Sequence, residues 1–226
     1  MKVAVLGTGM VGRSLAGRLS ELGHEVAVGT REVTATLART GPDAHGTAPY
    51  GVWAQDHPDV TLANFTEVAT SAELVVNATS GDVSMSTLNA VGETTLAGKI
   101  LLDISNPLDF SEGFPPKLFV KDTDSLGERI QAAFPQLKVV KALNTLTASL
   151  MVNPAALADG DHSVFVCGND SEAKQTVVEL LASFGHTDII DLGDITNARG
   201  TEMYLGIWTR LMAALGTSMF NVKVVR

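Results

Sequence analysis

MKVAVLGTGMVGRSLAGRLSELGHEVAVGTR, residues 1–31, joins a short apolar run, a glycine-rich turn, an amphipathic stretch and a second apolar run. The runs 2–6 and 25–29 predict two β-strands, and Gly23 ends the helix that is predicted between them. Four apolar side chains recur at helical spacing along that helix: Val11, Leu15, Leu19 and Leu22. Strand, glycine turn, helix and strand in this order are typical of the first unit of a dinucleotide-binding domain.

Three glycines form the G-x-G-x-x-G pattern of the turn: Gly7, Gly9 and Gly12. In such a unit the first glycine permits the tight turn, and the second lets the backbone approach the pyrophosphate of the dinucleotide. The third allows the helix to pack closely on the strand, while the helix N-terminus faces the phosphate charge. We therefore predict that these glycines bind a dinucleotide cofactor.

The end of the second strand indicates which dinucleotide is bound. NAD enzymes usually carry an acidic residue there, which binds the ribose hydroxyls. This chain has Thr30 and Arg31 instead, a hydroxyl donor followed by a guanidinium that pairs well with phosphate. Glu32 follows at the predicted start of a helix, where an acid interacts favourably with the helix dipole. The Thr30-Arg31 pair therefore predicts NADP(H), bound through its 2′-phosphate.

The composition fits one well-buried α/β domain with, at most, a small appendage. The 226 residues are 45% hydrophobic and 18% charged, with a net charge of −9 and no basic run, which disfavours nucleic acid and anionic membranes as partners. No apolar run reaches the ~18 residues of a membrane span and no signal peptide precedes the first strand, so we expect a soluble, cytoplasmic protein. We expect no metal site, and we interpret the single cysteine, Cys167, as a buried small hydrophobe.

Strand and helix signals alternate through the rest of the chain. Further strands are predicted over 60–63, 73–77, 99–103, 137–141, 163–167 and 188–191. The alternation predicts an α/β fold with a doubly wound, mostly parallel sheet of the Rossmann type. We assign residues 1–195 to the NADP-binding domain and residues 196–226 to a short C-terminal helical extension of the same compact unit.

Two further segments have no single interpretation. The segment 41–58, GPDAHGTAPYGVWAQDHP, is the clearest irregular region, and its Tyr50 and Trp53 either stack on a planar ligand or, as we favour, attach the segment to the body. A final helical stretch carries an apolar stripe of Met203, Ile207, Trp208, Leu211 and Leu215. Such a stripe belongs to the core or to a contact between subunits, and we expect a homodimer.

Ligands of an open α/β sheet bind beyond the carboxyl ends of its strands. Four segments rich in hydroxyl and amide groups are expected there: 78–82, 105–107, 144–147 and 197–200. In the first two, Thr79, Ser80 and Asn106 are predicted to border the ribose and nicotinamide, although such residues also cap helices and turns. The last two segments would face the second substrate.

The predicted acceptor side lacks an obvious proton donor. Reduction of a ketone or imine needs a general acid beside the reacting atom. We interpret Lys141, at a strand end, as solvated, and His162 and His186 precede strands, which predicts them at the opposite edge of the sheet. A flavin or deazaflavin ring accepts hydride at one atom and takes its proton from solvent, so it needs only a stacked geometry. The residues therefore favour a small-molecule redox acceptor with such a ring.

The chain resembles the coenzyme F420-dependent NADP oxidoreductase family, and also the cytosolic domain of six-transmembrane metalloreductases. The resemblance rests on MKVAVLGTGMVGRSLA with GHEVAVGTR, on VVKALNT (139–145) and on DLGDITNARGTEM (191–203). It implies hydride transfer between NADPH and a deazaflavin in one cleft. It also implies that the phosphates are bound by Gly7, Thr8, Gly9, Met10, Val11, Thr30 and Arg31. By the same resemblance, the deazaflavin side is lined by Asn144, Thr145 and Asn197, with Asn144 also beside the cofactor.

Two departures from the family pattern are visible. Family reductases tend to carry His where this chain has Asn144, and a further basic residue where it has Val-Thr-Ala-Thr over 33–36. Two other functions stay open. One is reduction of a small imine or carbonyl, as in the pyrroline-carboxylate and hydroxyacid families, which usually add a sizeable helical domain. The other is a non-catalytic NADP-binding sensor, which would bind NADPH tightly without turnover.

Overall fold

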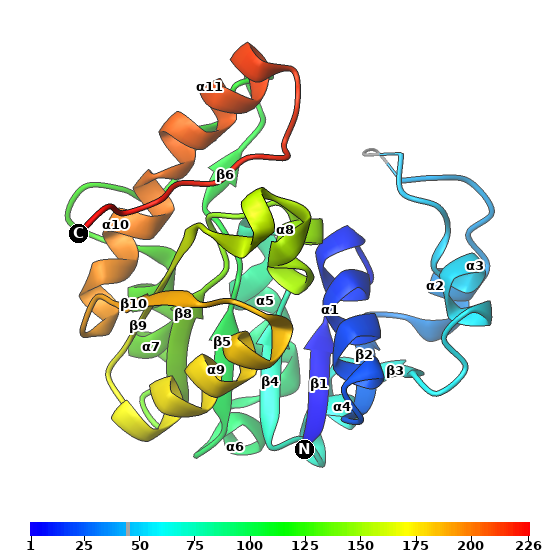
Figure 1. Ribbon diagram of the computed structural model, residues 1–226. Helices are drawn as coiled ribbons and strands as arrows, with labels where there is room; N and C mark the ends of the chain where they lie inside the picture. The colour runs from blue at the N-terminus through cyan, green and yellow to red at the C-terminus, as the bar shows by residue number, and fades with distance from the viewer. Residues whose placement is uncertain (44–45) are drawn as a thin grey trace.

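One eight-stranded sheet forms the centre of the protein, with helices on both faces (Figure 1). The computed structural model describes residues 1–43 and 46–226; residues 44 and 45, in the segment predicted to be irregular, lie outside the described residues. The strands follow the order β10-β9-β8-β5-β4-β1-β2-β3 across the sheet. Their bounds are β1 (Lys2–Leu6), β2 (Glu25–Thr30), β3 (Thr61–Asn64), β4 (Leu74–Asn77), β5 (Ile100–Asp103), β8 (Lys138–Ala142), β9 (Ser163–Gly168) and β10 (Asp188–Asp191).

The sheet is mostly parallel, as predicted. Strands β1 to β5 and β8 run in one direction, whereas β9 pairs antiparallel with β8, and β10 runs parallel to β9. Parallel strands that are covered on both faces are apolar along most of their length, and residues 3–6 of β1 and all of β4 are buried. The predicted doubly wound α/β fold is confirmed.

The helices pack on the sheet in two layers, each with its own apolar core. One layer contains α1 (Met10–Glu21), α8 (Ala148–Val152) and α9 (Ser171–Phe184). The other contains α4 (Phe65–Thr70), α5 (Gly81–Val91), α6 (Glu93–Leu96) and α7 (Leu126–Ala133). The remaining helices are α2 (Val33–Leu37), α3 (Tyr50–Gln55), α10 (Ala198–Met203) and α11 (Leu205–Leu215).

Local sequence signals fix several helix ends. Ser125 Oγ accepts a hydrogen bond from Glu128 N (3.1 Å) at the start of α7, which satisfies a backbone donor that the helix itself leaves unpaired. Gly185 takes a φ of +105° directly after α9, a left-handed conformation that favours glycine and ends the helix. These short-range signals explain why the alternation of elements is readable from the sequence.

The segment 41–58 is only partly irregular, because α3 forms within it. Tyr50 is 2% exposed and belongs to the core on the α1 side of the sheet. The Trp53 ring stacks on His57 at a centroid distance of 4.0 Å and packs against the same core. The two aromatic residues therefore attach the segment to the body of the protein, which confirms the favoured interpretation.

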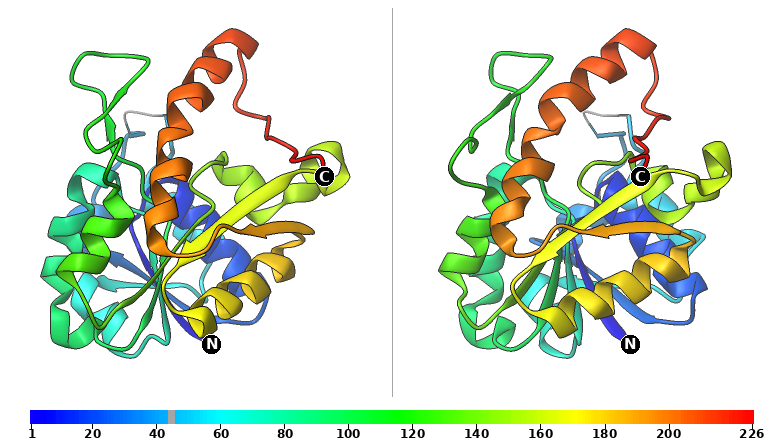
Figure 2. Two further views of the ribbon diagram at one scale, coloured as in Figure 1. Left: turned by 90° about the vertical axis from the view of Figure 1, so that its left-hand side faces the viewer. Right: turned by 60° about the vertical axis from the view of Figure 1, so that its left-hand side comes forward.

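Two segments rise beyond the carboxyl ends of the parallel strands (Figures 1 and 2). One is an antiparallel hairpin of β6 (Leu108–Asp109) and β7 (Lys117–Leu118), which form a separate two-stranded sheet. The other is α11, whose residues Ile207 and Leu215 are 55% and 57% exposed. Much of the apolar stripe therefore lies outside the core of this chain. None of the helices in the described ranges is long and apolar enough to cross a bilayer.

Cys167 lies on β9 and is completely buried. Burial raises the pKa of its thiol to about 12, so the nucleophilic thiolate is scarce at neutral pH. Cys167 is a small hydrophobic residue of the core, as predicted.

Candidate functional site

A cavity of about 800 Å³ opens at the edge where β1, β4 and β5 end. The starts of α1 and α5 contribute to its wall, together with the hairpin β6–β7 and with Asp43 and Thr47 from the segment before α3. Six residues predicted to bind the cofactor line it: Gly9, Met10, Val11, Thr79, Ser80 and Asn106. Two helix N-termini bring their positive dipole ends to one cavity, which favours an anionic ligand such as a pyrophosphate.

The glycines of the turn meet different physical needs. A Cβ on Gly7, whose φ is +121°, would lie 2.7 Å from the Ala78 carbonyl oxygen. A Cβ on Gly12 would lie 2.1 Å from the Gly7 carbonyl oxygen, so chain packing alone requires glycine at both positions. A Cβ on Gly9 would meet no described atom within 4 Å and would occupy open space at the cavity. The turn therefore fits a dinucleotide, because only a bare backbone at Gly9 leaves room for a pyrophosphate.

Arg13 on α1 supports this turn. Its Nε donates a hydrogen bond to the Thr8 carbonyl (2.7 Å), and its guanidinium also donates to the Ala48 carbonyl. The guanidinium carbon lies 5.6 Å from the centroid of the Tyr50 ring. Arg13 thus joins the glycine turn to the segment before α3, and it holds Thr8, which lines two smaller neighbouring pockets.

A second pocket, of about 350 Å³, lies at the end of β2 and contains the residues predicted to select NADP. Thr30 is buried, and its Oγ1 lies 2.7 Å from Thr36 Oγ1. Arg31 and Arg39 are exposed at this pocket, and neither guanidinium has a hydrogen-bond or ion-pair partner within the described part of the chain. Two free guanidinium groups beside hydroxyls fit a phosphomonoester, which accepts charge-assisted hydrogen bonds.

Sequence patterns did not identify Arg39. It follows α2, a helix of only 5 residues, so the chain returns to the pocket directly after the helix ends. The segment 33–36 carries no basic residue, and Arg39 supplies the second positive charge from beyond it. Glu32 also lines the pocket, but its carboxylate accepts a hydrogen bond from Thr34 N (3.3 Å) at the start of α2. The interpretation of Glu32 as a structural residue at the start of a helix is confirmed, and its side chain also caps that helix.

Buried hydrogen bonds join the ends of β4 and β5. Asn77 Nδ2 donates to Asp103 Oδ1 (2.8 Å) and to Ser84 Oγ (3.1 Å). Thr79 Oγ1 donates to Asn77 Oδ1 (2.6 Å), so Thr79 fixes the turn before α5 and also lines the cavity. Ser80 is the residue before α5, but its side chain makes no capping hydrogen bond there. Thr79 therefore has the structural role in the turn, and it also lies at the cavity where the cofactor contact is predicted.

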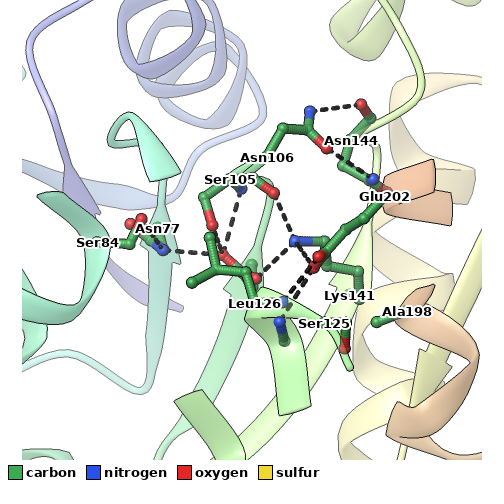
Figure 3. A network of polar contacts seen from close by, with 12 residues as sticks. Asn77, Ser84, Ser105, Asn106, Ser125, Leu126, Lys141, Asn144, Ala198 and Glu202 are labelled. Atoms are coloured by element: carbon green, nitrogen blue, oxygen red, sulfur yellow. Dashed lines mark hydrogen bonds and ion pairs between the residues drawn. The ribbon is translucent and has the colours of Figure 1, made fainter. Parts of the chain in front are cut away.

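A fully buried lysine lies between two carboxylates beside the cavity (Figure 3). Lys141 Nζ lies 2.8 Å from Asp103 Oδ2 and 2.8 Å from Glu202 Oε1, and it also donates to the Ser105 carbonyl. None of the three charged side chains is more than 1% exposed. Burial alone would lower the pKa of Lys141, but the two carboxylates outweigh this effect and raise the pKa. The prediction that Lys141 is solvated is wrong; it is a permanently charged, enclosed group.

Glu202 connects this ion cluster to two helices. Its carboxylate accepts hydrogen bonds from Leu126 N (2.7 Å) and Gly127 N (3.0 Å), the first N–H groups of α7. Arg199, on α10 like Glu202, donates from Nε to Glu128 Oε2 of α7 (2.8 Å). The C-terminal helices are thereby anchored to the ends of β5 and β8. An acidic residue close to an apolar helical stripe was the only sequence signal for Glu202.

Asn106 lines the cavity, whereas Asn144 and Thr145 lie behind it and are each 3% exposed. Asn144 Nδ2 donates to Asn106 Oδ1 (3.0 Å), and Asn106 Nδ2 donates to the Asn144 carbonyl (2.8 Å; Figure 3). Leu143 takes a φ of +61°, a strained conformation for leucine, directly before this contact. Asn144 therefore holds Asn106 in position, and neither Asn144 nor Thr145 lines the cavity.

The reversed direction of β9 and β10 contradicts the positions predicted from the sequence for three residues. Asn197 follows β10, so it lies away from the edge where the parallel strands end, and it is exposed and outside the cavity. His162 and His186 precede β9 and β10, so they lie at the ligand edge and not at the opposite edge. Both are buried, and their Nε2 atoms lie 3.1 Å and 2.9 Å from the carbonyl oxygens of Pro154 and Met151. Neither histidine lines the cavity.

The glycine turn, the arginine-lined pocket and the cavity at the strand ends are the features of an NADP-dependent oxidoreductase with a Rossmann fold. Comparison with known proteins identifies the family. Residues 2–107 match the model described as NADP oxidoreductase, coenzyme F420-dependent, and the chain belongs to this family.

Three relatives illustrate the similarity. The crystal structure of a candidate F420-dependent NADP reductase from Arthrobacter sp. FB24 has 60% sequence identity and a TM-score of 0.96, with 100% of both chains covered. The F420-dependent NADP reductase of Methanocaldococcus jannaschii is 28% identical over 204 residues, 89% of this chain and 88% of the relative. Metalloreductase STEAP3 of Rattus norvegicus is 33% identical over 202 residues, 89% of this chain but 36% of its own length. The chain therefore spans about a third of that metalloreductase.

Replacing Lys141 with methionine leaves two buried carboxylates without their counter-ion. We expect Lys141→Met to lower the free energy of unfolding by about 3–5 kcal/mol in urea denaturation. Lys138→Met is the matched control, because Lys138 lies on the same strand and forms an ion pair with Asp170. This pair is partly exposed: 34% of the Lys138 side chain and 32% of the Asp170 side chain are open to solvent. Such a bridge contributes about 0–1 kcal/mol. Equal losses in the two variants would contradict the role assigned to Lys141.

Proposed function

We propose that the protein transfers a hydride between NADP(H) and a deazaflavin, coenzyme F420, or a related flavin ring. Membership of the family supports the NADP dependence, and the names of two archaeal relatives specify an F420-dependent NADP reductase. The observation that carries the proposal is the 800 Å³ cavity, which adjoins the glycine turn and also includes an apolar hairpin. Both substrates would share this cavity.

The residues of the cofactor half have defined tasks in this proposal. The turn 7–12 and the start of α1 bind the pyrophosphate. Thr30, Arg31 and Arg39 bind the 2′-phosphate. Thr79 and Asn106 border the ribose and nicotinamide, with Ser80 beside them, and Asn144 keeps Asn106 in place. NADPH, when bound, supplies the hydride from its nicotinamide ring.

The described lining of the cavity supports a ring acceptor over a ketone or imine. It contains no histidine, lysine, tyrosine or cysteine, and its ionisable side chains are three aspartates: Asp43, Asp82 and Asp109. Hydrogen bonds from Ser111 lower the pKa of Asp109, so this carboxyl group holds no proton at neutral pH. A tricyclic ring takes up the hydride with its two electrons, and solvent supplies the proton. The chain then has to orient two rings with the reacting atoms about 3–3.5 Å apart.

Anaerobic stopped-flow measurement of NADPH oxidation identifies the acceptor. The panel contains coenzyme F420, FMN, FAD and a set of small carbonyl and imine compounds. We expect rapid loss of NADPH absorbance with F420 or a flavin and none with the carbonyl set. Turnover of carbonyl or imine compounds alone would overturn the proposal. Tight NADPH binding without turnover of any acceptor would instead indicate a sensor.

The arginine pocket predicts how the protein distinguishes NADPH from NADH. We expect Arg31→Ala and Arg39→Ala each to raise the KM for NADPH by about 10- to 100-fold, since each removes a charge-assisted hydrogen bond. The KM for NADH should stay close to its wild-type value. Arg129→Ala, which removes an exposed arginine of α7 that pairs with Asp124, is the control. If the KM values for both cofactors rise equally, these arginines do not bind the 2′-phosphate.

We further propose that two copies of the chain associate through α11. Ile207 and Leu215 on this helix, with Met203 before it, leave apolar surface open to solvent in a single copy. A two-fold contact would cover the same face of α11 in both copies.

Size-exclusion chromatography with light scattering tests this association. We expect a mass of twice 23.7 kDa for the wild-type protein and a monomer for Ile207→Glu, which places a charge in the contact. Val52→Glu is the control, because Val52 on α3 is 52% exposed, close to the 55% of Ile207, and lies outside α11. A wild-type mass of 23.7 kDa would refute the dimer.

A further inference from the structure

Three exposed phenylalanines lie on the hairpin β6–β7 and its flanks: Phe110, Phe114 and Phe119. They are 52%, 50% and 41% exposed, in the same order. Single exposed apolar residues are ordinary, but three large rings on one short hairpin form a concentrated apolar surface. The strands of this hairpin pair only with each other in the described sheets, so the hairpin is not part of the central sheet.

Two of the three rings belong to the cavity of the proposed reaction. Phe110 and Phe119 line it together with Leu108 and Ile104, whereas Phe114 is not part of its lining. The first strand of the hairpin begins two residues after Asn106, the residue that borders the nicotinamide in the proposed function. The two phenyl rings therefore share one cavity with the cofactor half of the site.

The backbone beside both rings is held by hydrogen bonds. Phe119 N donates to the Pro107 carbonyl (2.9 Å), which extends the pairing of the hairpin back to its first residues. Ser111 N donates to Asp109 Oδ1 (2.8 Å), which fixes the chain on both sides of Phe110. An ion pair between Lys117 and Glu112 joins the two arms. These contacts hold the backbone that carries the two phenyl rings in one conformation.

We propose that Phe110 and Phe119 form the binding face for the planar ring of the hydride acceptor. The inference rests on the proposed function and assigns the residues that receive its second substrate. Aromatic side chains bind planar π-systems by stacking and need no polar group for it. The polar residues that the sequence suggested for the acceptor, Asn144 and Thr145, are buried behind Asn106 and do not line the cavity.

Recognition by stacking defines the class of acceptor. A tricyclic deazaflavin and a tricyclic flavin present similar apolar faces, so both bind to the phenyl rings. A small aliphatic carbonyl compound has no such face and gains little from them. The hairpin therefore selects for an extended planar ring and tolerates variation at the edge of that ring.

The test compares phenylalanines inside and outside the cavity. In Phe110→Ala/Phe119→Ala we expect the KM for F420 and for FMN to rise at least about tenfold, because each stacked ring contributes a several-fold gain in affinity. The dissociation constant of NADPH, measured by calorimetry, should change by less than about twofold, because the cofactor is held through its phosphates. Phe114→Ala is the matched control, since it removes a ring of similar exposure from the same hairpin. It should leave both values unchanged.

The outcomes separate this inference from the proposed function. If the acceptor KM of the double variant equals that of the wild type or of Phe114→Ala, the hairpin does not bind the ring. If the wild-type protein oxidises NADPH with carbonyl compounds and not with F420 or flavins, the proposed function itself fails. Should the double alanine variant unfold, Phe110→Leu/Phe119→Leu decides by the same comparison, because leucine keeps an apolar side chain with much of the volume and removes the aromatic face.

Discussion

One ammonium group between two buried carboxylates holds the ligand edge of this protein together. Lys141 belongs to β8, Asp103 to β5 and Glu202 to the C-terminal helix α10, so three distant segments meet at a single positive charge. The second negative charge is balanced by the first N–H groups of α7, where the helix dipole is positive. Removal of Lys141 would leave two buried carboxylates without their counter-ion. Lys141 also donates to the Ser105 carbonyl, so the placement of Ser105, next to Asn106, depends on this lysine.

Most of the fold was predictable because its signals are local. Apolar runs, the glycine turn and residues such as Gly185 act within a few positions of the chain, and they mark elements whatever the rest of the molecule does. The direction of a strand has no such signal, since β9 has the same apolar pattern whether it runs parallel or antiparallel to β8. The reversal of β9 and β10 was therefore missed, and Asn197, His162 and His186 were assigned to the wrong edges.

The residues of the candidate site also fall into two groups: those that short-range spacing in the sequence places, and those that the packing of distant segments brings in. Gly9, Thr30 and Arg31 lie within one βαβ unit, so their spacing in the sequence fixes their spacing in space. Arg39 reaches the same pocket only because α2 is short, and Glu202 reaches Lys141 only because α10 packs on α7. A lysine at a strand end is usually solvated, and this one is enclosed because two carboxylates arrive from elsewhere in the chain.

The hairpin β6–β7 and the arginine pocket are built on separate parts of the chain. The hairpin forms its own two-stranded sheet in the described structure, whereas the pocket grows out of the end of β2. No residue of the hairpin lines the arginine pocket, and no strand is shared between the two features in the described structure. In the proposed function, the hairpin receives the acceptor and the pocket binds the 2′-phosphate. Under that proposal the preferred acceptor can change during evolution while the preferred dinucleotide stays the same, and one scaffold then serves several redox pathways that draw on a single pool of reducing equivalents.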